Sequence, residues 1–149
     1  MKIAIIADSH DNIVNIEKFI GWAKKNKIGL IIHCGDICAG STMRLIGENF
    51  SGSVHFILGN VTTDWETLKE KSADLDNVKI YYRGIGKLDI DGLKIIFCHY
   101  PWQADQLAKT GKYDLVFYGH DHKPWEKTIG KTRMLNPGTL AGMFNKATF

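Results

Sequence analysis

The stretch Ile3-Ala4-Ile5-Ile6-Ala7-Asp8-Ser9-His10 places a short apolar run directly before a carboxylate and an imidazole. Such a run is typical of a strand buried on both faces, as in a parallel sheet covered by helices. At the carboxyl ends of these strands, open α/β sheets form the crevice in which ligands bind. Asp8 and His10 are two positions apart, so both side chains can point into the crevice and bind one divalent ion.

Four other apolar runs, at 28–34, 54–58, 93–98 and 115–118, end in the same way. A single Asp, Asn or His after a strand is common in turns or in packing. Five strand ends that all carry metal-ligand residues are poorly explained by turn formation alone. The sequence therefore predicts a metal centre formed by Asp8, His10, Asp36, Asn60, His99, His120 and His122.

Helices are predicted between these strands. Ile13, Ile16, Ile20 and Ala23 have the spacing of one helix face, with Asp11 or Asn12 as the N-cap. Ser41 or Thr42 is expected to cap a second helix, which ends at about 49. A capping box at 63–66 predicts a third helix to about 73. Pro101 suits the first position of a fourth helix, which ends at about 109.

Two hairpins and two further strands complete the expected elements. Asp91-Gly92 joins 85–90 to 93–98, and Gly130-Lys131 joins 124–129 to 132–135. A brief strand is expected at 78–82. The last residues resemble the start of another strand, which could be shortened or completed by a second copy of the chain in a homodimer.

Composition places the chain among ordinary globular proteins. It has 149 residues, 44% hydrophobic and 23% charged, which fits a single domain over 1–149. A net charge of +3 is too small to indicate nucleic acid. No run reaches the ~18–20 apolar residues of a membrane helix. Cys34, Cys38 and Cys98 form no CxxC pair, so we expect reduced thiols and a cytoplasmic protein.

Seven ligand residues are too many for one tetrahedral ion and suit two ions that share a ligand. A carboxylate can bridge because it has two oxygens, and Asp36 is the central candidate. Only Asp8 and Asp36 are anionic among the seven, so two divalent ions would leave excess positive charge. An anionic substrate, such as a small phosphate ester, is therefore expected.

The order Asp8-x-His10, Gly35-Asp36, Gly59-Asn60, His99 and Gly119-His120-x-His122, with the turn 136–138, resembles the calcineurin-like metallophosphoesterase superfamily, and its small prokaryotic phosphodiesterases in particular. The resemblance implies a four-layer αββα sandwich of two mixed β-sheets flanked by helices, the metallo-dependent phosphatase fold. It also implies one ion held by Asp8, His10, Asp36 and His122, and a second held by Asp36, Asn60, His99 and His120.

The implied reaction is phosphodiester hydrolysis by a hydroxide that bridges the two ions, with Asp36 and Asn60 among the catalytic residues. Manganese is the expected metal, with nickel, iron, cobalt and zinc as alternatives. Two positions depart from the family pattern: Val61 replaces the usual His or Cys after the metal-binding Asn, and Tyr100-Pro101-Trp102 replaces Gly-His after His99. No general acid is identified, so aryl or otherwise activated phosphodiesters are the expected substrates.

Other interpretations remain open. The chain could be a non-catalytic scaffold that keeps the sandwich, as a retromer subunit of this superfamily does, or a phosphodiesterase that acts on nucleic acid. Trp102 is expected in the core, and His33 and His55 as packed histidines. Residues that could instead line the mouth of the site are Tyr100, Trp102, Asp121, Lys123 and Arg133.

Overall fold

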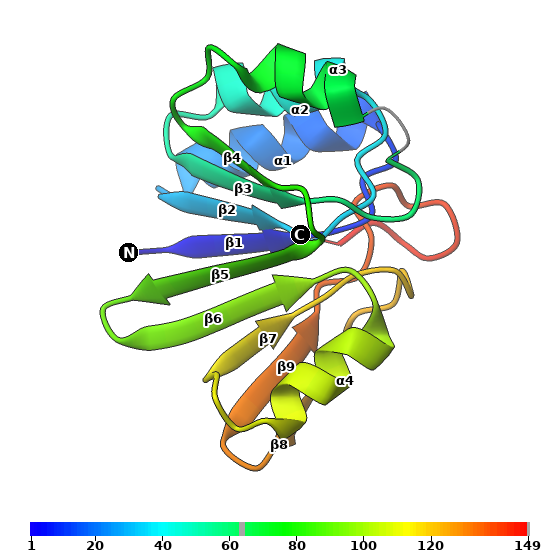
Figure 1. Cartoon of the computed structure of the whole chain (residues 1–149). Helices are drawn as coiled ribbons and strands as arrows, with labels where there is room; N and C mark the ends of the chain where they lie inside the picture. Colours follow the sequence, from blue (N-terminus) through cyan, green and yellow to red (C-terminus); the bar gives the residue numbers. More distant parts are fainter. Residues whose placement is uncertain (63–64, 149) are drawn as a thin grey trace.

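The first sheet is built from the apolar runs of the amino-terminal half. A computed structural model describes residues 1–62 and 65–148. Its strands β1 (Ile3–Ile6), β2 (Leu30–His33), β3 (Ser53–Ile57) and β4 (Val78–Tyr81) lie side by side in chain order (Figure 1). All three strand pairs are parallel, so the carboxyl ends of the strands lie along one edge of the sheet.

Three helices cover the outer face of this sheet (Figure 1). They are α1 (Ile13–Lys25), α2 (Gly40–Asn49) and α3 (Trp65–Ser72). α1 buries Ile16, Phe19, Ile20 and Ala23 in a cluster that includes residues of β1, β2 and β3. Apolar residues at this spacing stabilise the helix chiefly by packing against the sheet.

The second sheet has the order β5-β6-β7-β9-β8. Its strands are β5 (Ile85–Ile90), β6 (Leu93–Cys98), β7 (Leu115–Phe117), β8 (Trp125–Ile129) and β9 (Thr132–Asn136). Parallel pairs join β6 to β7 and β7 to β9, and the two hairpins are antiparallel. Helix α4 (Pro101–Lys109) covers the outer face, where Ala104 and Ala108 pack on β6 and β7.

The inner faces of the two sheets pack on each other. One buried cluster joins Ile32 and Ile57 of the first sheet to Ile95, Phe97 and Phe117 of the second. The order of layers is therefore helix, sheet, sheet, helix, which confirms the predicted αββα sandwich. The expectation that both sheets are mixed is wrong for the first, because every strand pair between its described strands is parallel.

Most predicted elements form near their expected bounds. Asn12 caps α1, since its Oδ1 accepts a hydrogen bond from the amide of Asn15 at 3.1 Å. The hairpin turn at Asp91-Gly92 has positive φ at both residues, 53° and 84°, as a type I′ turn requires. The predicted capping box includes Thr63 and Asp64, which lie outside the described residues.

Four local predictions are wrong. Ile13 is 39% exposed and stands off the buried face of α1, and Trp102 is 59% exposed rather than in the core. Neither Ser41 nor Thr42 caps α2, because the helix already begins at Gly40 with Ala39 as its N-cap. No strand forms among residues 137–148, which run as a loop.

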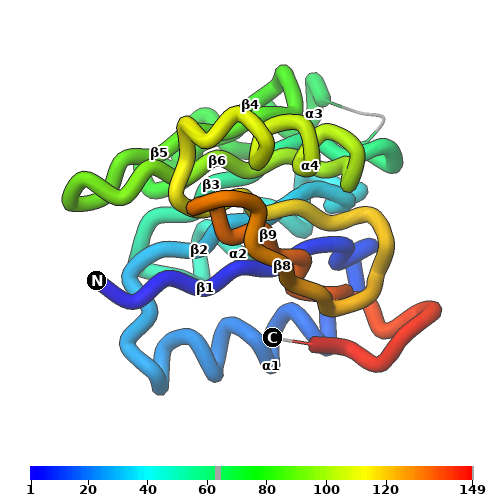
Figure 2. Tube along the Cα trace, turned by 90° about the horizontal axis from the view of Figure 1, so that it is seen from below, coloured from blue at the N-terminus to red at the C-terminus, as the bar shows by residue number. Residues whose placement is uncertain are grey.

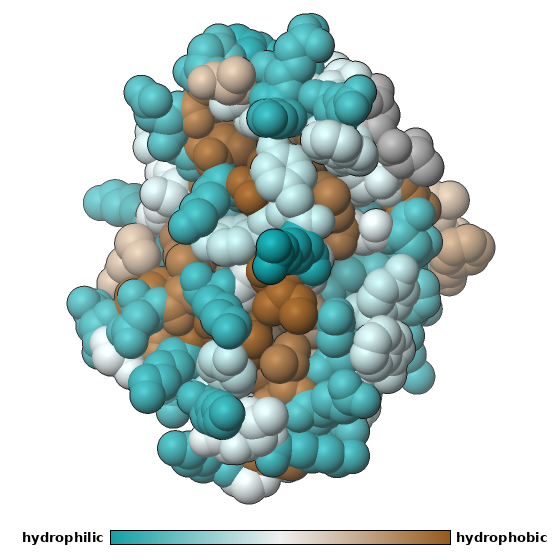
Figure 3. Space-filling view, viewed as in Figure 1, coloured by the Kyte–Doolittle hydropathy of each residue, from teal (hydrophilic) through white to brown (hydrophobic). Residues whose placement is uncertain are grey.

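The carboxyl-terminal loop lies beside the amino end of α1 rather than at a sheet edge (Figure 2). The Nδ2 atom of Asn12 donates to the carbonyl of Ala141 at 2.8 Å, and that of Asn15 donates to the carbonyl of Leu140 at 2.9 Å. Figure 3 shows apolar side chains projecting outward on the same side of the molecule. The loop contributes Met143 and Phe144, which are 61% and 78% exposed.

Phe97 is the residue whose loss should weaken the contact between the sheets most directly. It is fully buried on β6, and its ring lies edge-on to Tyr81 of β4 with the centroids 5.3 Å apart. We expect Phe97→Ala to lower the free energy of unfolding by about 3–5 kcal/mol, measured by urea denaturation. Leu93→Ala, on the same strand but 39% exposed, should cost less than about 1 kcal/mol. Equal losses would contradict this account of the core.

Candidate metal centre

Main-chain hydrogen bonds bring the strand ends together. The amide of Asp8 donates to the carbonyl of Gly35 at 3.0 Å, and that of His10 donates to the carbonyl of Asp36 at 3.0 Å. In the second sheet, the amide of Gly119 donates to the carbonyl of His99 at 3.1 Å. The loops that follow β1, β2, β6 and β7 are thereby held side by side.

The first group of possible ligands contains Asp8, His10, Asp36 and His122, each with one ligand atom within 4.8 Å of the others. The Nε2 atoms of His10 and His122 are 3.1 Å apart. Nε2 of His122 is 3.7 Å from Oδ1 of Asp8, and Nε2 of His10 is 3.7 Å from Oδ2 of Asp36. These four residues are those that the family resemblance assigned to one ion.

The second group contains Asp36, His99 and His120, with ligand atoms within the same 4.8 Å. Nε2 of His99 is 3.3 Å from Oδ1 of Asp36. Oδ1 of Asn60 is 2.9 Å from Nε2 of His99 and 3.0 Å from Nδ1 of His120, so the amide oxygen joins this group. Asp36 is common to both groups and presents one oxygen to each.

These spacings suit metal coordination. Two ligands about 2.1 Å from one ion lie about 3.0–3.4 Å apart at octahedral or tetrahedral angles. Most distances within each group are close to that range. The imidazole and carboxylate donors also suit divalent transition metals. The residues present therefore fit the metal pair that the family resemblance implies.

The two carboxylates are almost completely buried: Asp8 is 0% exposed and Asp36 is 2% exposed. Burial raises the pKa of Asp8 to about 7, against the opposing effect of His99. Burial also acts to raise the pKa of Asp36, but the hydrogen bond and charge of His99 outweigh it and lower that pKa. Burial lowers the pKa of His122, which favours the neutral imidazole that binds metals.

Neighbouring groups orient the possible ligands. Nδ1 of His99 lies 2.8 Å from the carbonyl of Cys34, so a proton on Nδ1 leaves Nε2 free to bind a metal. The amide of His120 donates to both oxygens of Asp8, at 3.1 and 3.0 Å. The amide of Val61 donates to Oδ1 of Asp36 at 3.2 Å.

The ligand loops have an unusual backbone. Positive φ values, which side chains disfavour, occur at Asp8, His10, Asp36, His120 and His122, between 40° and 74°. Such conformations persist where surrounding contacts over-determine them, and they cluster at functional sites. The hydrogen bonds between the strand-end loops are contacts of this kind.

The sequence interpretation missed two contributors to the site. Ser9 lies beneath the ligands, with Oγ 2.9 Å from Nε2 of the buried His33; burial lowers the pKa of His33 to about 3, so the ring is neutral. The carboxyl-terminal loop also binds the end of β1. Thr139 Oγ1 and the amide of Ala141 donate to the carbonyl of Asp8 at 2.9 and 3.0 Å. The turn at 136–138 was the available signal for this loop.

Only some of the residues that were expected at the mouth of the metal site lie there. A cleft of about 530 Å³ contains ligand residues together with Val61, Asp121, Met143 and Phe144. Tyr100 approaches the cleft through His120, with the ring centroids 5.0 Å apart. Arg133 instead pairs with Glu126 at 2.7 Å on the exposed hairpin.

The two histidines that were predicted to be packed, His33 and His55, have partners inside the fold. His33 is buried, and Nδ1 of His55 lies 2.9 Å from the hydroxyl of Tyr81. All three cysteines are free, and Cys34 and Cys98 are buried in the core clusters. Cys38 belongs to neither ligand group. Its backbone amide donates to Oδ1 of Asp11 at 3.0 Å.

Comparison with known proteins gives concordant matches over almost the whole chain. Residues 1–149 match the family model of the calcineurin-like phosphoesterase superfamily domain. The chain is 31% identical over 144 residues to phosphodiesterase MJ0936 of Methanocaldococcus jannaschii, an alignment that covers 95% of this chain and 86% of the relative.

Solved structures agree. A structure described as a novel archaeal phosphodiesterase superposes with a TM-score of 0.88 at 28% identity, covering 97% of this chain and 87% of the other. Vps29 from Entamoeba histolytica, in a complex with zinc, has a TM-score of 0.67 at 19% identity over 97% and 78% of the two chains. At that identity the second likeness concerns the fold alone.

Gly59 offers a direct test of the ligand geometry, because a Cβ atom at this position would collide with the carboxylate and amide of Asp36. We expect Gly59→Ala to weaken binding of Mn²⁺ at least about tenfold in calorimetric titration, through displacement of the shared carboxylate. Gly21→Ala is the matched control, since nothing lies within 4 Å of a Cβ there on α1. It should leave metal binding unchanged and stabilise the fold by about 0.5–1 kcal/mol. Unchanged metal binding in Gly59→Ala would refute the arrangement.

Proposed function

Since the chain belongs to the calcineurin-like phosphoesterase superfamily, we propose that it is a phosphodiesterase with a two-ion metal centre. It hydrolyses small phosphodiesters with activated, aryl-type leaving groups. The observation that carries this proposal is the position of Asp36 between the two ligand groups. One carboxylate that faces histidines on both sides can hold two ions close together, the arrangement that favours phosphate esters as substrates.

Seven residues would hold the pair. Asp8, His10, Asp36 and His122 form one site, and Asp36, Asn60, His99 and His120 form the other. Divalent ions bound here supply Lewis acidity toward the phosphate and lower the pKa of water enough to make a nucleophile near neutral pH. We propose that Asp36 fixes the distance between the two ion sites. Asn60 would bind the second ion from the solvent-exposed side.

The charge balance supports an anionic substrate. Asp8 and Asp36 are the two carboxylates in the ligand groups, and the remaining members are neutral when they bind a metal. Two divalent ions therefore exceed the ligand charge by about two units. A phosphodiester, which carries one negative charge and two substituents, fits a centre whose cleft is open to solvent beside Val61 and Phe144.

The leaving-group preference follows from Val61. Val61 directly follows the ligand Asn60 and lines the cleft, and its isopropyl side chain can neither donate nor accept a proton. A leaving group that departs as a stable anion needs no proton donor, whereas an alkoxide does. This supports p-nitrophenyl and similar diesters as good substrates.

We also propose the metal, the compartment and the assembly state. Manganese is the metal we propose, with nickel, iron, cobalt and zinc as alternatives that the same donors accommodate. We place the protein in the cytoplasm, consistent with its three free thiols. None of the helices in the described residues has the length and apolar character that a bilayer crossing requires. We further propose a single domain over 1–149 and a homodimer.

Hydrolysis of bis-p-nitrophenyl phosphate tests the proposed enzyme. With Mn²⁺ present, we expect release of p-nitrophenolate, and we expect Asp36→Asn to reduce kcat/KM more than about 100-fold because the shared ligand loses its charge. Asp76→Asn, an exposed carboxylate before the amino end of β4, is the control and should retain full activity. Metal bound with no turnover above that of Asp36→Asn would favour the non-catalytic scaffold instead.

The absence of a proton donor at position 61 predicts a steep dependence on the leaving group. Diesters with p-nitrophenolate as leaving group should be cleaved about 10²–10⁴-fold faster than the corresponding alkyl diesters, beyond their difference in uncatalysed rate. Val61→His introduces a proton donor and should reduce this rate difference, because hydrolysis of the alkyl diesters becomes faster. The measurement is kcat/KM against leaving-group pKa for both proteins, and identical slopes would contradict the role given to Val61.

A further inference from the structure

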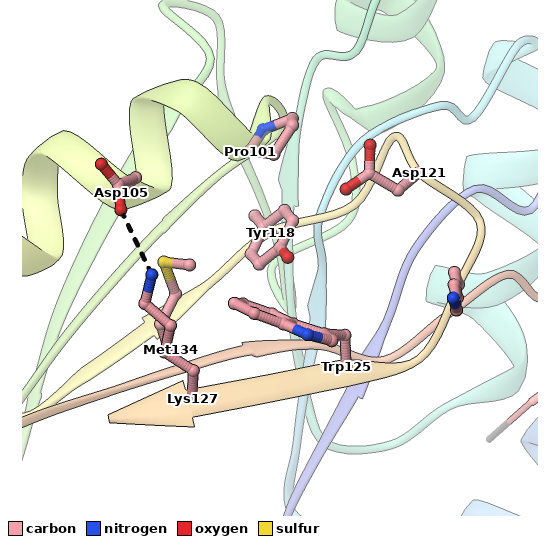
Figure 4. Close-up of a pocket in the computed structure, with 8 residues that line it drawn as sticks. Pro101, Asp105, Tyr118, Asp121, Trp125, Lys127 and Met134 are labelled. Carbon is pink, nitrogen blue, oxygen red and sulfur yellow. Dashed lines mark ion pairs between the residues drawn. The ribbon is translucent and has the colours of Figure 1, made fainter. Parts of the chain in front are cut away.

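We propose that a pocket next to the metal cleft binds an aromatic substituent of the phosphodiester, either an aryl ring or a nucleobase. This assignment rests on the proposed phosphodiesterase function. The pocket, called the side pocket here, has a volume of about 400 Å³ and lies between α4, the end of β7 and β8 (Figure 4). Its walls include Pro101, Tyr118, Asp121, Trp125, Lys127 and Met134.

The side pocket adjoins the metal cleft, because Asp121 lines both. Asp121 stands in the chain between the ligand residues His120 and His122, and Figure 4 shows it on the loop above the rings of Tyr118 and Trp125. A phosphodiester carries two substituents. With its phosphate at the ligand groups, one substituent can remain in the open cleft while the other passes Asp121 into the side pocket.

The surfaces of the side pocket suit a flat ring. Trp125 is 43% exposed, whereas Tyr118 and Met134 are each only 3% exposed and form a packed floor. An indole ring that is accessible to solvent beside a buried phenol offers a face on which another aromatic ring can stack. The volume lies in the lower part of the range for small-molecule sites, about 300–1,000 Å³.

Charged groups flank the Trp125 ring. Lys127 lies over it, with Nζ 5.7 Å from the ring centroid, and the same Nζ is 3.7 Å from Oδ1 of Asp105 on α4. The ion pair, drawn in Figure 4, links β8 to the helix across the pocket. At the other end, the carboxylate of Asp121 can accept a hydrogen bond from an amino or hydroxyl group of the substituent.

The neighbouring aromatic pair lies outside the side pocket. Tyr100 and Trp102 are stacked on each other, with centroids 6.1 Å apart and the planes inclined by 21°. Neither residue is among those that line the side pocket, whereas Trp125 is. Trp125 is consequently the aromatic residue that we assign to substrate binding.

The test is the steady-state kinetics of the Mn²⁺-loaded protein with bis-p-nitrophenyl phosphate and with thymidine 5′-p-nitrophenyl phosphate. Trp125→Ala should raise KM about 5- to 100-fold, the usual range for loss of one stacked ring, with kcat changed less than about threefold. Trp125→Phe should restore most of the affinity. Trp22→Ala, on α1 across the molecule, should leave both constants unchanged, and circular dichroism checks that each variant is folded.

Thymidine and p-nitrophenol, used as competitive inhibitors, distinguish a nucleobase from an aryl ring in the side pocket. The compound that fits the pocket better should inhibit the unmodified protein more strongly, and this difference in inhibition should disappear in Trp125→Ala. Turnover with an unchanged KM in Trp125→Ala would overturn this assignment and leave the proposed function standing. A rise in KM in Trp102→Ala alone would also overturn it, whereas no turnover by the unmodified protein would overturn the proposed function itself.

Discussion

Two buried carboxylates at the junction of the two sheets impose the main constraint on this structure. Asp8 and Asp36 are withdrawn from water at the ends of β1 and β2, and a buried charge is costly unless it is paired or bound to a cation. Main-chain amides and His99 compensate part of that cost. Bound cations would compensate the rest, so the same arrangement that strains the fold favours metal binding.

The buried carboxylates also constrain the backbone conformation of the loops around them. Five of the proposed ligands adopt positive φ, and Gly59 has to be a glycine because any side chain would occupy the position of the Asp36 carboxylate. The strand-end loops are thus shaped around the ligands rather than for regular turn geometry. The rest of the sandwich provides the rigid packing against which this local strain is held.

Much of this arrangement was predictable, because the apolar runs that form buried strands are short and end in polar residues that share one edge. The same reading placed α1 and both hairpins, whose signals are local. The sequence predictions were wrong where tertiary contacts determine burial or the path of the chain. Ile13 has the correct helical spacing but stands at the first turn, beyond the part of α1 that the sheet covers. The path of residues 137–148 depends on hydrogen bonds to β1 and α1, which no local pattern encodes.

The bonds from Thr139 and Ala141 to Asp8 join residues more than 130 positions apart. During synthesis, the first ligand leaves the ribosome long before the loop that secures it, and the imidazoles of His120 and His122 also arrive late. The first group of possible ligands is therefore complete only when His122 of the second half has joined Asp8, His10 and Asp36 of the first. A metal ion bound by all four residues would then stabilise the packing of the two sheets together.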